Sequence, residues 1–285
     1  MHKERTKLIK SVEADFAEVN FIRQKLAKVI DKSRETLYED DEIFIKNMKS
    51  NNLAGDDINR YRYWEWPQGV SLFGFWKLFE ATGDKKYLDI ITKYYDRQFQ
   101  TGLPSKNINT TAPMLTMAFL YEYTKCDRYR EVCTEWAEWL VRYLPRTRED
   151  GFQHITSDTL NKDEIWVDTL FMSVLFLAKI GVAVNCEKWV EEAKYQFLMH
   201  SKYLTDRKTG LWYHGWTFNG DHNFTGALWG RGNCWITIAI PEFLATVRCE
   251  AGIEKYLVQL LTRQVEALEK YQDSGGMWHT IINDP

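Results

Sequence analysis

An aspartate in an apolar segment is the side chain of this sequence best suited to acid–base chemistry. Asp168 lies in EIWVDTLFM, where the spacing predicts the first turn of an otherwise apolar helix, with Trp166 and Phe171 close by. A carboxyl group withdrawn from water there is expected to have a raised pKa and to hold a proton near neutral pH. We therefore expect Asp168 to act as a general acid and base. Asp163 and Glu164 are interpreted instead as charges that offset the dipole at the start of the helix.

The stretch from Gly210 to Trp235 is rich in aromatic residues and shows no periodicity. It holds two histidines, Arg231 between two glycines, and four tryptophans, namely Trp212, Trp216, Trp229 and Trp235. An indole ring offers a flat face to a sugar ring or a cation. A guanidinium can hold a carboxylate by two parallel hydrogen bonds. This favours a binding site, although a packed loop that plugs a helical core remains the alternative.

Three loops repeat one local pattern, in which a histidine follows a glycine and an apolar or aromatic residue. They run from Gly151 to His154, from Gly210 to His214 and from Gly276 to His279. The first two precede predicted buried helices. We therefore expect all three histidines to gather at one mouth of an inner ring and to form the polar rim of a pocket.

The elements that would position these residues are repeated pairs of helices. Residues 73–99 and 115–140 resemble each other, and residues 171–197 and 237–265 follow the same plan less closely. Each unit is an apolar helix, a short turn and an amphipathic helix, which predicts an inner layer of helices wrapped by an outer one. No strand-like alternation persists.

Two of the expected helices can be placed by residue, one before these units and one that is the apolar helix of the first unit. One is predicted from about Lys3 to Thr36. Another follows Pro67, its first residue, and ends at Gly83 in the left-handed conformation. The segment from Glu39 to Asn59 is polar and is expected to be loop with a short helix.

The fold class expected is all-α, a single α/α barrel domain over residues 1–285. The N-terminal helix and four pairs give about nine helices, whereas a closed double ring needs about three more. We therefore expect a barrel that is incomplete at its C-terminal end, or an open one.

Composition excludes several classes of function. The net charge of −3, with both signs dispersed, argues against nucleic acid as a partner. The five cysteines show no metal-binding spacing, so we expect reduced thiols, a cytosolic location, and neither metal nor cofactor. The sequence has no secretory signal at its start and no apolar window of about 20 residues, so no membrane partner is expected.

A second catalytic carboxylate is not evident in the sequence. Glu80 and Glu122 are expected at helix ends, and Glu242 follows Pro241 deep in a helix. Glycoside hydrolysis by a carboxylate pair needs the second group roughly 5–10 Å from the first. The sequence has no nucleophile elbow, phosphate loop or Ser/His/Asp arrangement either.

Several motifs together resemble the unsaturated uronyl hydrolases, glycoside hydrolase family 105 and, more distantly, family 88. The resemblance runs from about Trp64 to Pro285. Its motifs are WPQGV at 66–70, FWKLFEATGDKKYL after it, NINTTAP at 107–113, WVD at 166–168, GLWYHGW at 210–216 and WGRGNCW at 229–235.

The resemblance implies an (α/α)6 barrel that hydrates the C4–C5 double bond of the unsaturated uronic acid left at a nonreducing end by polysaccharide lyases. Asp168 would protonate C4 and activate water for addition at C5, and the resulting hemiketal would open to release the sugar. The residues expected to meet the substrate are Trp66, Asn109, His154, Trp166, His214, Trp229, Arg231 and Trp235. Two of these depart from the family pattern, because Trp66 stands where Tyr is frequent and Asn107-Ile108-Asn109 offers amides where an Asp is common.

The expected substrate is an unsaturated uronyl oligosaccharide, most simply a rhamnogalacturonan-derived disaccharide. Two other classes stay open. One is an inverting α/α-barrel glycosidase or sugar epimerase, which needs a further carboxylate or a histidine pair. The other is a non-catalytic carbohydrate-binding barrel. The sequence does not fix the oligomeric state.

Overall fold

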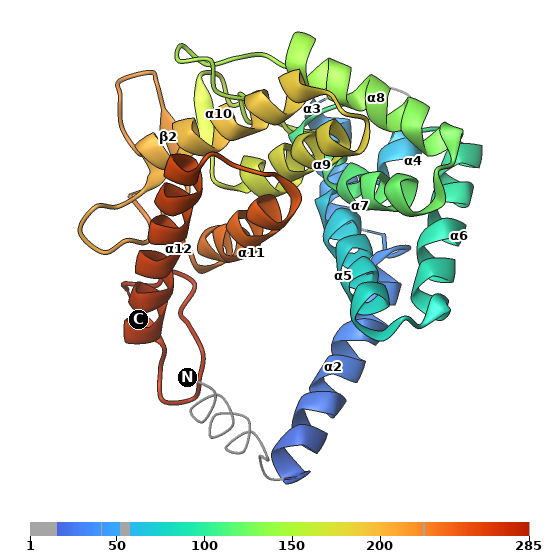
Figure 1. The fold of residues 1–285 in the computed structure, drawn as a ribbon, viewed down its shortest axis with the longest axis horizontal. Coiled ribbons are helices and arrows are strands. Elements are labelled where there is room, and N and C mark those ends of the chain that lie inside the picture. Colours follow the sequence, from blue (N-terminus) through green and yellow to red (C-terminus); the bar gives the residue numbers. More distant parts are fainter. Residues whose placement is uncertain (1–15, 41, 52–57, 225, 285) are drawn as a thin grey trace.

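The computed structural model describes residues 16–40, 42–51, 58–224 and 226–284. Its helices form two layers, an inner set whose members pack on one another and an outer set that covers them (Figure 1). The inner helices are α5 (Trp66–Thr82), α7 (Ile108–Thr124), α9 (Leu175–Ala183) and α11 (Gly230–Thr246). The outer helices are α6 (Lys85–Thr101), α8 (Asp127–Arg142), α10 (Glu187–Leu204) and α12 (Ala251–Tyr271). Each inner helix is followed in the chain by its outer partner, which confirms the predicted pairs.

The two layers follow from two kinds of helix. α9 buries every residue from Leu175 to Gly181, and α7 buries Ile108 and the whole run from Thr110 to Leu120. Such helices, apolar on nearly all sides, have no face to offer to water and must lie inside. α6 buries a single stripe that includes Tyr87 and Ile91, so its charged face stays in solvent.

The turns inside the pairs explain the repeat seen in the sequence. α5 ends at Gly83 with φ 68°, and α7 ends at the equivalent Lys125 with φ 56°. Both adopt the left-handed conformation that stops a helix and reverses the chain. Asp84 then accepts a hydrogen bond from the backbone N–H of Lys86 and so caps the start of α6.

The N-terminal part adds three helices. α2 (Phe16–Thr36) packs on α5, while α3 (Glu42–Asn51) and α4 (Ile58–Tyr61) lie before the barrel helices. The predicted N-terminal helix is therefore present from residue 16, and its residues 3–15 lie outside the described part. The predicted short helix in the polar segment is α3; residues 52–57 of that segment are likewise not described.

A two-stranded ribbon is the element that the sequence did not reveal. β1 (Glu164–Trp166) pairs antiparallel with β2 (Gly215–Thr217), with Trp166 opposite Gly215. The expectation of no strand is thus wrong at this point, and Glu164 belongs to a strand rather than to a helix start. Strands of three residues are too short to show a period, and this pair is held by backbone bonds between distant loops.

This double layer of paired helices is an α/α barrel, the all-α class that the sequence predicted. Among the described helices, none combines the length and the apolar character that crossing a bilayer requires. All five cysteines are free thiols.

Candidate active site

A cavity of about 150 Å³ opens at the end of the barrel where α5, α7 and α11 begin. It is smaller than the roughly 300–1,000 Å³ clefts that hold drug-sized ligands, and a single sugar ring suits it better. The residues that line it are Trp66, Asn109, His154, Thr156, Trp166, Asp168, Met172, His214, Trp229, Arg231 and Trp235. The structure therefore brings together all nine residues that the sequence analysis assigned to the site.

Asp168 stands where the ribbon meets an inner helix. Two residues before it β1 ends, and the backbone N–H of Val167 donates to the carbonyl of His214 (2.9 Å). Helical backbone begins at Asp168, as expected, and continues through the π-helix η2 (Leu170–Val174) into α9. A π-helix is a local widening that recurs at functional sites. Here it places Met172 in the cavity wall.

The carboxylate of Asp168 has two side-chain neighbours on its two oxygens. The indole N–H of Trp235 donates to Oδ1 (3.0 Å), and His214 Nε2 lies 3.4 Å from Oδ2, longer than an ordinary hydrogen bond. The side chain is only 14% exposed. A buried carboxylate with one oxygen held and the other facing an imidazole is arranged to exchange a proton.

The expectation that Asp168 has a raised pKa is wrong. Burial by itself raises the pKa of this carboxyl, but the close contact with His214 and the attraction of the His154 and His214 imidazoles outweigh burial and lower the pKa below its ordinary value. In the free protein Asp168 is therefore a carboxylate. The sequence showed the apolar helix that desolvates Asp168 but not the imidazoles that face it.

Two histidines and one tryptophan form a stacked wall beside Asp168. The rings of His154 and Trp166 are nearly parallel, with centroids 4.5 Å apart, and His214 meets Trp166 edge to face at 4.6 Å. His154 Nδ1 shares a hydrogen bond with the hydroxyl of Thr169 (2.8 Å). Burial lowers the pKa of His154 to about 4, so its imidazole is neutral at ordinary pH.

The opposite wall of the cavity carries the guanidinium of Arg231. The guanidinium carbon of Arg231 lies 4.2 Å from the ring centre of Trp229 and 5.3 Å from that of Trp66. Within the described part of the chain no carboxylate pairs with this exposed side chain. Arg231 is therefore held in direction by two aromatic faces while its donors stay available to an anion.

A buried amide fixes the loop that carries His214. Asn233 accepts a hydrogen bond from the backbone N–H of Trp212 (2.8 Å) and donates to its carbonyl (2.9 Å), and it also donates to the carbonyl of Trp229 (3.0 Å). Gln264 of α12 donates to Asn233 Oδ1 in turn. The start of α11 and the loop after α10 are thus joined as one unit.

The aromatic stretch from Gly210 to Trp235 divides between two roles. Trp229 and Trp235 line the cavity, whereas Trp212 is completely buried in the core and Trp216 lies in β2 against Tyr203. The packed-loop explanation therefore holds for Trp212 and Trp216, while the position of Trp229 and Trp235 in the cavity wall leaves the binding site a prediction for those two.

The third histidine of the repeated loops does not join the site. His279 is exposed and lines a separate apolar hollow of about 670 Å³ on the other side of Trp229 and Arg231. The prediction that three histidines share one mouth is wrong for His279. The backbone there pairs with the start of α11, since the N–H of Gly230 donates to the carbonyl of Thr280 (2.8 Å).

One buried carboxyl near the site was missed by the sequence analysis. Glu65 is 6% exposed, precedes Trp66, and accepts a hydrogen bond from the hydroxyl of Ser157. Burial raises the pKa of Glu65 to about 7, with Asp158 adding to the effect, while the bonds from Ser157 and the Trp66 backbone oppose it. The sequence motif that could have revealed Glu65 is E-W-P-Q at 65–68. Glu65 caps α5 there, and Gln68 accepts a hydrogen bond from the backbone N–H of Glu65.

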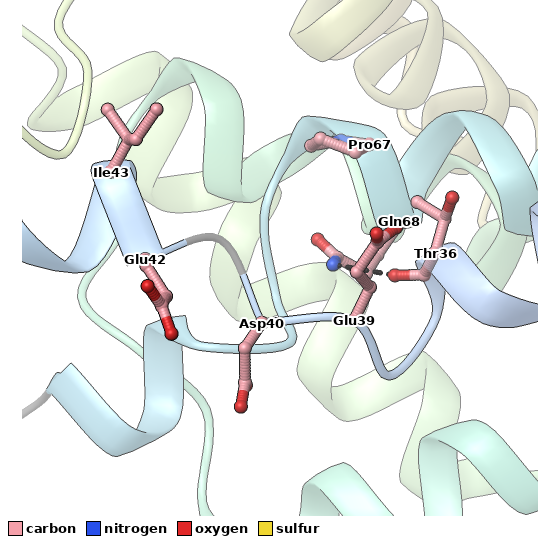
Figure 2. Close-up of a pocket in the computed structure, with 7 residues that line it drawn as sticks. All are labelled: Thr36, Glu39, Asp40, Glu42, Ile43, Pro67 and Gln68. Carbon is pink, nitrogen blue, oxygen red and sulfur yellow. Dashed lines mark hydrogen bonds between the residues drawn. The ribbon is translucent and has the colours of Figure 1, made fainter.

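A larger hollow of about 530 Å³ lies on the outer side of the start of α5 (Figure 2). Three of its lining side chains are the carboxylates Glu39, Asp40 and Glu42. Gln68 reaches across to the carbonyl of Thr36 and ties this region to α2. Glu39 is paired with Lys32 and Asp40 with Arg62, and none of the predicted site residues lines this hollow.

Metal ligation is not indicated in the described residues. No group of three His, Cys, Asp or Glu side chains within the described ranges is close enough to share an ion. Glu80 and Glu242 both pair with Lys77, and Glu122 pairs with Lys179, all away from the cavity.

The fold and cavity define an α/α-barrel protein whose cavity is lined by one carboxylate together with imidazole, indole and guanidinium groups. Comparison with protein families agrees, because residues 41–285 match the model of glycosyl hydrolase family 88. The chain belongs to this family.

Particular relatives narrow the comparison. The chain is 33% identical over 224 residues to the unsaturated rhamnogalacturonyl hydrolase YesR of Bacillus subtilis (strain 168), an alignment that covers 78% of this chain and 65% of that protein. The chain thus spans just under two thirds of the length of this curated relative.

Solved structures give the same picture. A possible member of family 105 from Salmonella enterica subsp. enterica serovar Paratyphi A superposes with a TM-score of 0.81 and 40% identity, over 92% of this chain and 70% of that one. A family 105 glycoside hydrolase from C. acetobutylicum superposes with a TM-score of 0.69 and 28% identity, over 85% of this chain and 70% of that one.

Proposed function

We propose that this protein is a hydrolase that releases 4,5-unsaturated uronic acid from the nonreducing end of lyase-generated oligosaccharides by hydrating the C4–C5 double bond. The observation that carries the proposal is the single carboxylate of the cavity. Among the described lining residues Asp168 is the only carboxylate, and its neighbours are arranged for proton exchange. Hydration of a vinyl ether needs one proton-shuttling group rather than two.

The protonation state of Asp168 can be followed through each step of this reaction. In the free protein the group is ionised. A uronate bound in the cavity brings a second negative charge, which raises the pKa of Asp168 and lets it take up a proton. Asp168 then gives that proton to C4 and, again a carboxylate, accepts one from the water that adds to C5. The resulting hemiketal opens and the adjoining sugar leaves with a free hydroxyl.

The remaining lining residues have roles that follow from their chemistry. Arg231, free of a protein carboxylate in the described residues and backed by Trp229 and Trp66, holds the uronate. Trp235 fixes one oxygen of Asp168, and His214 polarises the other. His154 stays neutral and can accept or donate a hydrogen bond to a sugar hydroxyl.

The substrate class follows from the relatives rather than from the cavity. A 33% identical relative is named for unsaturated rhamnogalacturonyl substrates. We therefore propose rhamnogalacturonan-derived unsaturated disaccharides, and a part in pectin degradation. Asn109 in the wall offers an amide where a carboxylate is common in this family, so this chain has one negative charge less in the cavity.

The two alternative classes make different demands. An inverting glycosidase needs a second carboxylate facing the sugar. One buried candidate, Glu65, is outside the lining and is engaged by Ser157 and the backbone of Trp66. A non-catalytic barrel requires no proton-exchanging group, so the contact of Asp168 with an imidazole at 3.4 Å favours the catalytic class.

The test is the loss of ultraviolet absorbance of the conjugated double bond on mixing with lyase-generated disaccharides. Asp168→Asn should lower the rate by roughly a thousandfold, the range typical for loss of a general acid–base group. Asp163→Asn is the matched control, because it removes one negative charge from the same loop outside the cavity and keeps a residue that tolerates the left-handed backbone at φ 58°.

Three outcomes separate the candidate functions. Wild-type hydration that vanishes in Asp168→Asn and survives in Asp163→Asn supports the proposal. An unchanged rate in Asp168→Asn contradicts the assigned role. Sugar binding by the wild type without any loss of absorbance favours the non-catalytic class.

We also propose a cytoplasmic location. The support is the set of five free thiols, two of which, Cys126 and Cys234, are exposed. Exposed unpaired thiols are usual where the cell keeps thiols reduced. Fractionation of the source cells tests this, and recovery of the protein from the medium or an oxidising compartment contradicts it.

A further inference from the structure

Three segments that build the sugar cavity meet at one buried hydroxyl. Ser157 Oγ donates to Glu65 Oε1 and accepts a hydrogen bond from Asn107 Nδ2 (2.9 Å). Glu65 caps the start of α5, and Asn107 caps the start of α7. All three side chains are at least nine-tenths buried.

Each segment contributes a residue to the cavity wall close to this junction. Trp66 directly follows Glu65, Asn109 lies two residues after Asn107, and Thr156 directly precedes Ser157. These three residues line the cavity, whereas the junction lies behind them. A change at the junction therefore reaches the cavity only through the placement of its walls.

We propose that Glu65 is a positioning residue, whose carboxylate acts through Ser157 to hold the starts of α5 and α7 and the segment 154–157 in the relative placement that forms the sugar cavity. The proposal deepens the proposed function, and its kinetic part rests on it.

The directions of the hydrogen bonds select a carboxylate at position 65. Asn107 Oδ1 accepts from the backbone N–H of Thr110 (2.9 Å), which turns the donating Nδ2 toward Ser157. The single hydroxyl proton of Ser157 must then go to Glu65 Oε1. The other oxygen, Oε2, accepts from the backbone N–H of Trp66 (3.3 Å). In the ionised form, which predominates above its pKa of about 7, both oxygens of Glu65 thus act as acceptors.

An amide cannot replace this group. Glu65→Gln has one acceptor and one donor, so in either orientation an N–H faces another donor, at Ser157 or at Trp66. Glu65→Asp separates two roles of residue 65, the N-cap of α5 and the hydrogen bond with Ser157. Aspartate is a good N-cap for α5, but it is one methylene too short to keep the bond to Ser157.

The experiment measures KM and kcat for hydration by Glu65→Asp, Glu65→Gln, Ser157→Ala and the double variant Glu65→Asp/Ser157→Ala. We expect KM to rise about tenfold in each single variant with kcat within about twofold. The double variant should match the singles, because residues acting as one unit are not additive. Asp84→Ala is the control, since it removes the N-cap of the outer helix α6, away from the cavity.

A second measurement does not depend on activity. Hydrogen exchange at the amides of Ile108, bonded to the carbonyl of Ile155, and of Thr110, bonded to Asn107, should quicken about tenfold in Ser157→Ala and Glu65→Asp. The same amides should be unchanged in Asp84→Ala.

The results separate the positioning role of Glu65 from the proposed hydrolase function. A raised KM with quicker exchange at Ile108 and Thr110 supports the positioning role. A fall in kcat with KM unchanged, or wild-type KM and exchange rates in Glu65→Asp, shows that Glu65 is only a helix cap. Either result overturns the positioning role. If the wild type hydrates no unsaturated sugar, the proposed function fails, and unchanged exchange in Ser157→Ala would then overturn the positioning role separately.

Discussion

At the scale of single residues, burial acts in opposite directions on the acids and the bases around the cavity. It raises the pKa of Glu65 to about 7 and lowers the pKa of His154 and His200 to about 4. At Asp168 the imidazole of His214 reverses the effect of burial. Burial therefore decides the direction of the pKa shift at Glu65, His154 and His200, whereas the imidazoles that face Asp168 decide it there.

The buried histidines make stability fall in acid. His200 is fully buried, and its folded pKa of about 4 lies below the ordinary 6.5. On acidification from pH 6.5 to 4 the unfolded chain binds a proton that the folded chain refuses, which costs up to about 3 kcal/mol per histidine. Glu65 has a raised pKa, so its stabilisation is present at low pH and is lost as pH rises from 4.5 to about 7. His154 and His200 together outweigh it.

Urea unfolding at several pH values checks this balance. Between pH 6.5 and 4 the free energy of unfolding of His200→Gln should depend on pH less steeply than that of the wild type. The difference in slope should correspond to about one bound proton. Above pH 7 the two pH dependences should run parallel. Parallel curves over the whole range would show that His200 is protonated in the folded protein.

Arg231 should control substrate affinity more than turnover. Arg231→Lys keeps the charge but loses the planar fork, so KM should rise about tenfold, and Arg231→Met should raise it about a hundredfold. The exposed Arg248, outside the cavity, is the control as Arg248→Met. Steady-state kinetics measure both parameters. An unchanged KM in Arg231→Met would remove Arg231 from uronate binding.

At the scale of elements, the close approach of α5 and α7 sets the width of the barrel end. A Cβ built on Gly69 would lie 2.6 Å from the backbone carbon of Ala112 and 2.8 Å from the nitrogen of Pro113. Backbone atoms cannot move aside as a flexible side chain can. Trp66 and Asn109 sit at the starts of these two helices, so their spacing across the cavity depends on this contact.

Two glycines of α5 form a matched pair for testing this contact. Gly69→Ala should destabilise the protein by about 2 kcal/mol, because overpacking exceeds the gain of about 1 kcal/mol in helix propensity. Gly74→Ala meets nothing within 4 Å and should stabilise by up to about 1 kcal/mol. Denaturant midpoints measure both. Equal effects at the two positions would mean that α5 and α7 separate at no cost.

At the scale of the whole molecule, the cavity joins parts of the chain that are far apart. Its walls come from the starts of three inner helices, from the ribbon and from the loop that Asn233 ties to α11. A ligand that contacts all of them binds the folded state alone. Binding must therefore appear as global stabilisation.

Thermal unfolding of Asp168→Asn with an unsaturated disaccharide measures that linkage without turnover. At a ligand concentration a hundred times Kd the stabilisation is about 2.7 kcal/mol, which should raise Tm by roughly 5–10 °C. Rhamnose without the uronate should give no comparable shift. The double variant Asp168→Asn/Arg231→Met should lose most of the rise in Tm that the unsaturated disaccharide causes. A shift that survives Arg231→Met would place the ligand elsewhere.

The sequence by itself determined the paired helices and their two layers, and the motifs of the family resemblance named nine of the residues that line the cavity. Periodicity and apolar faces are local properties, so residue order alone assigns α5, α7, α9 and α11 to the inside of the barrel. Asp168, Arg231 and Trp229 could be named because carboxylate, guanidinium and indole groups carry their chemistry in their type, whereas Trp66 and Asn109 were named through the family resemblance.

Tertiary structure decided what depends on partners distant in the chain. The pKa of Asp168 is set by His214, the ribbon forms only when two loops meet, and His279 faces a hollow of its own. Glu65 is buried where Ser157 donates to it, and Asn107 donates to Ser157 in turn. These outcomes rest on distances across the fold, to which hydrogen bonds and desolvation are sensitive within about an ångström, and the local order of residues does not encode such distances.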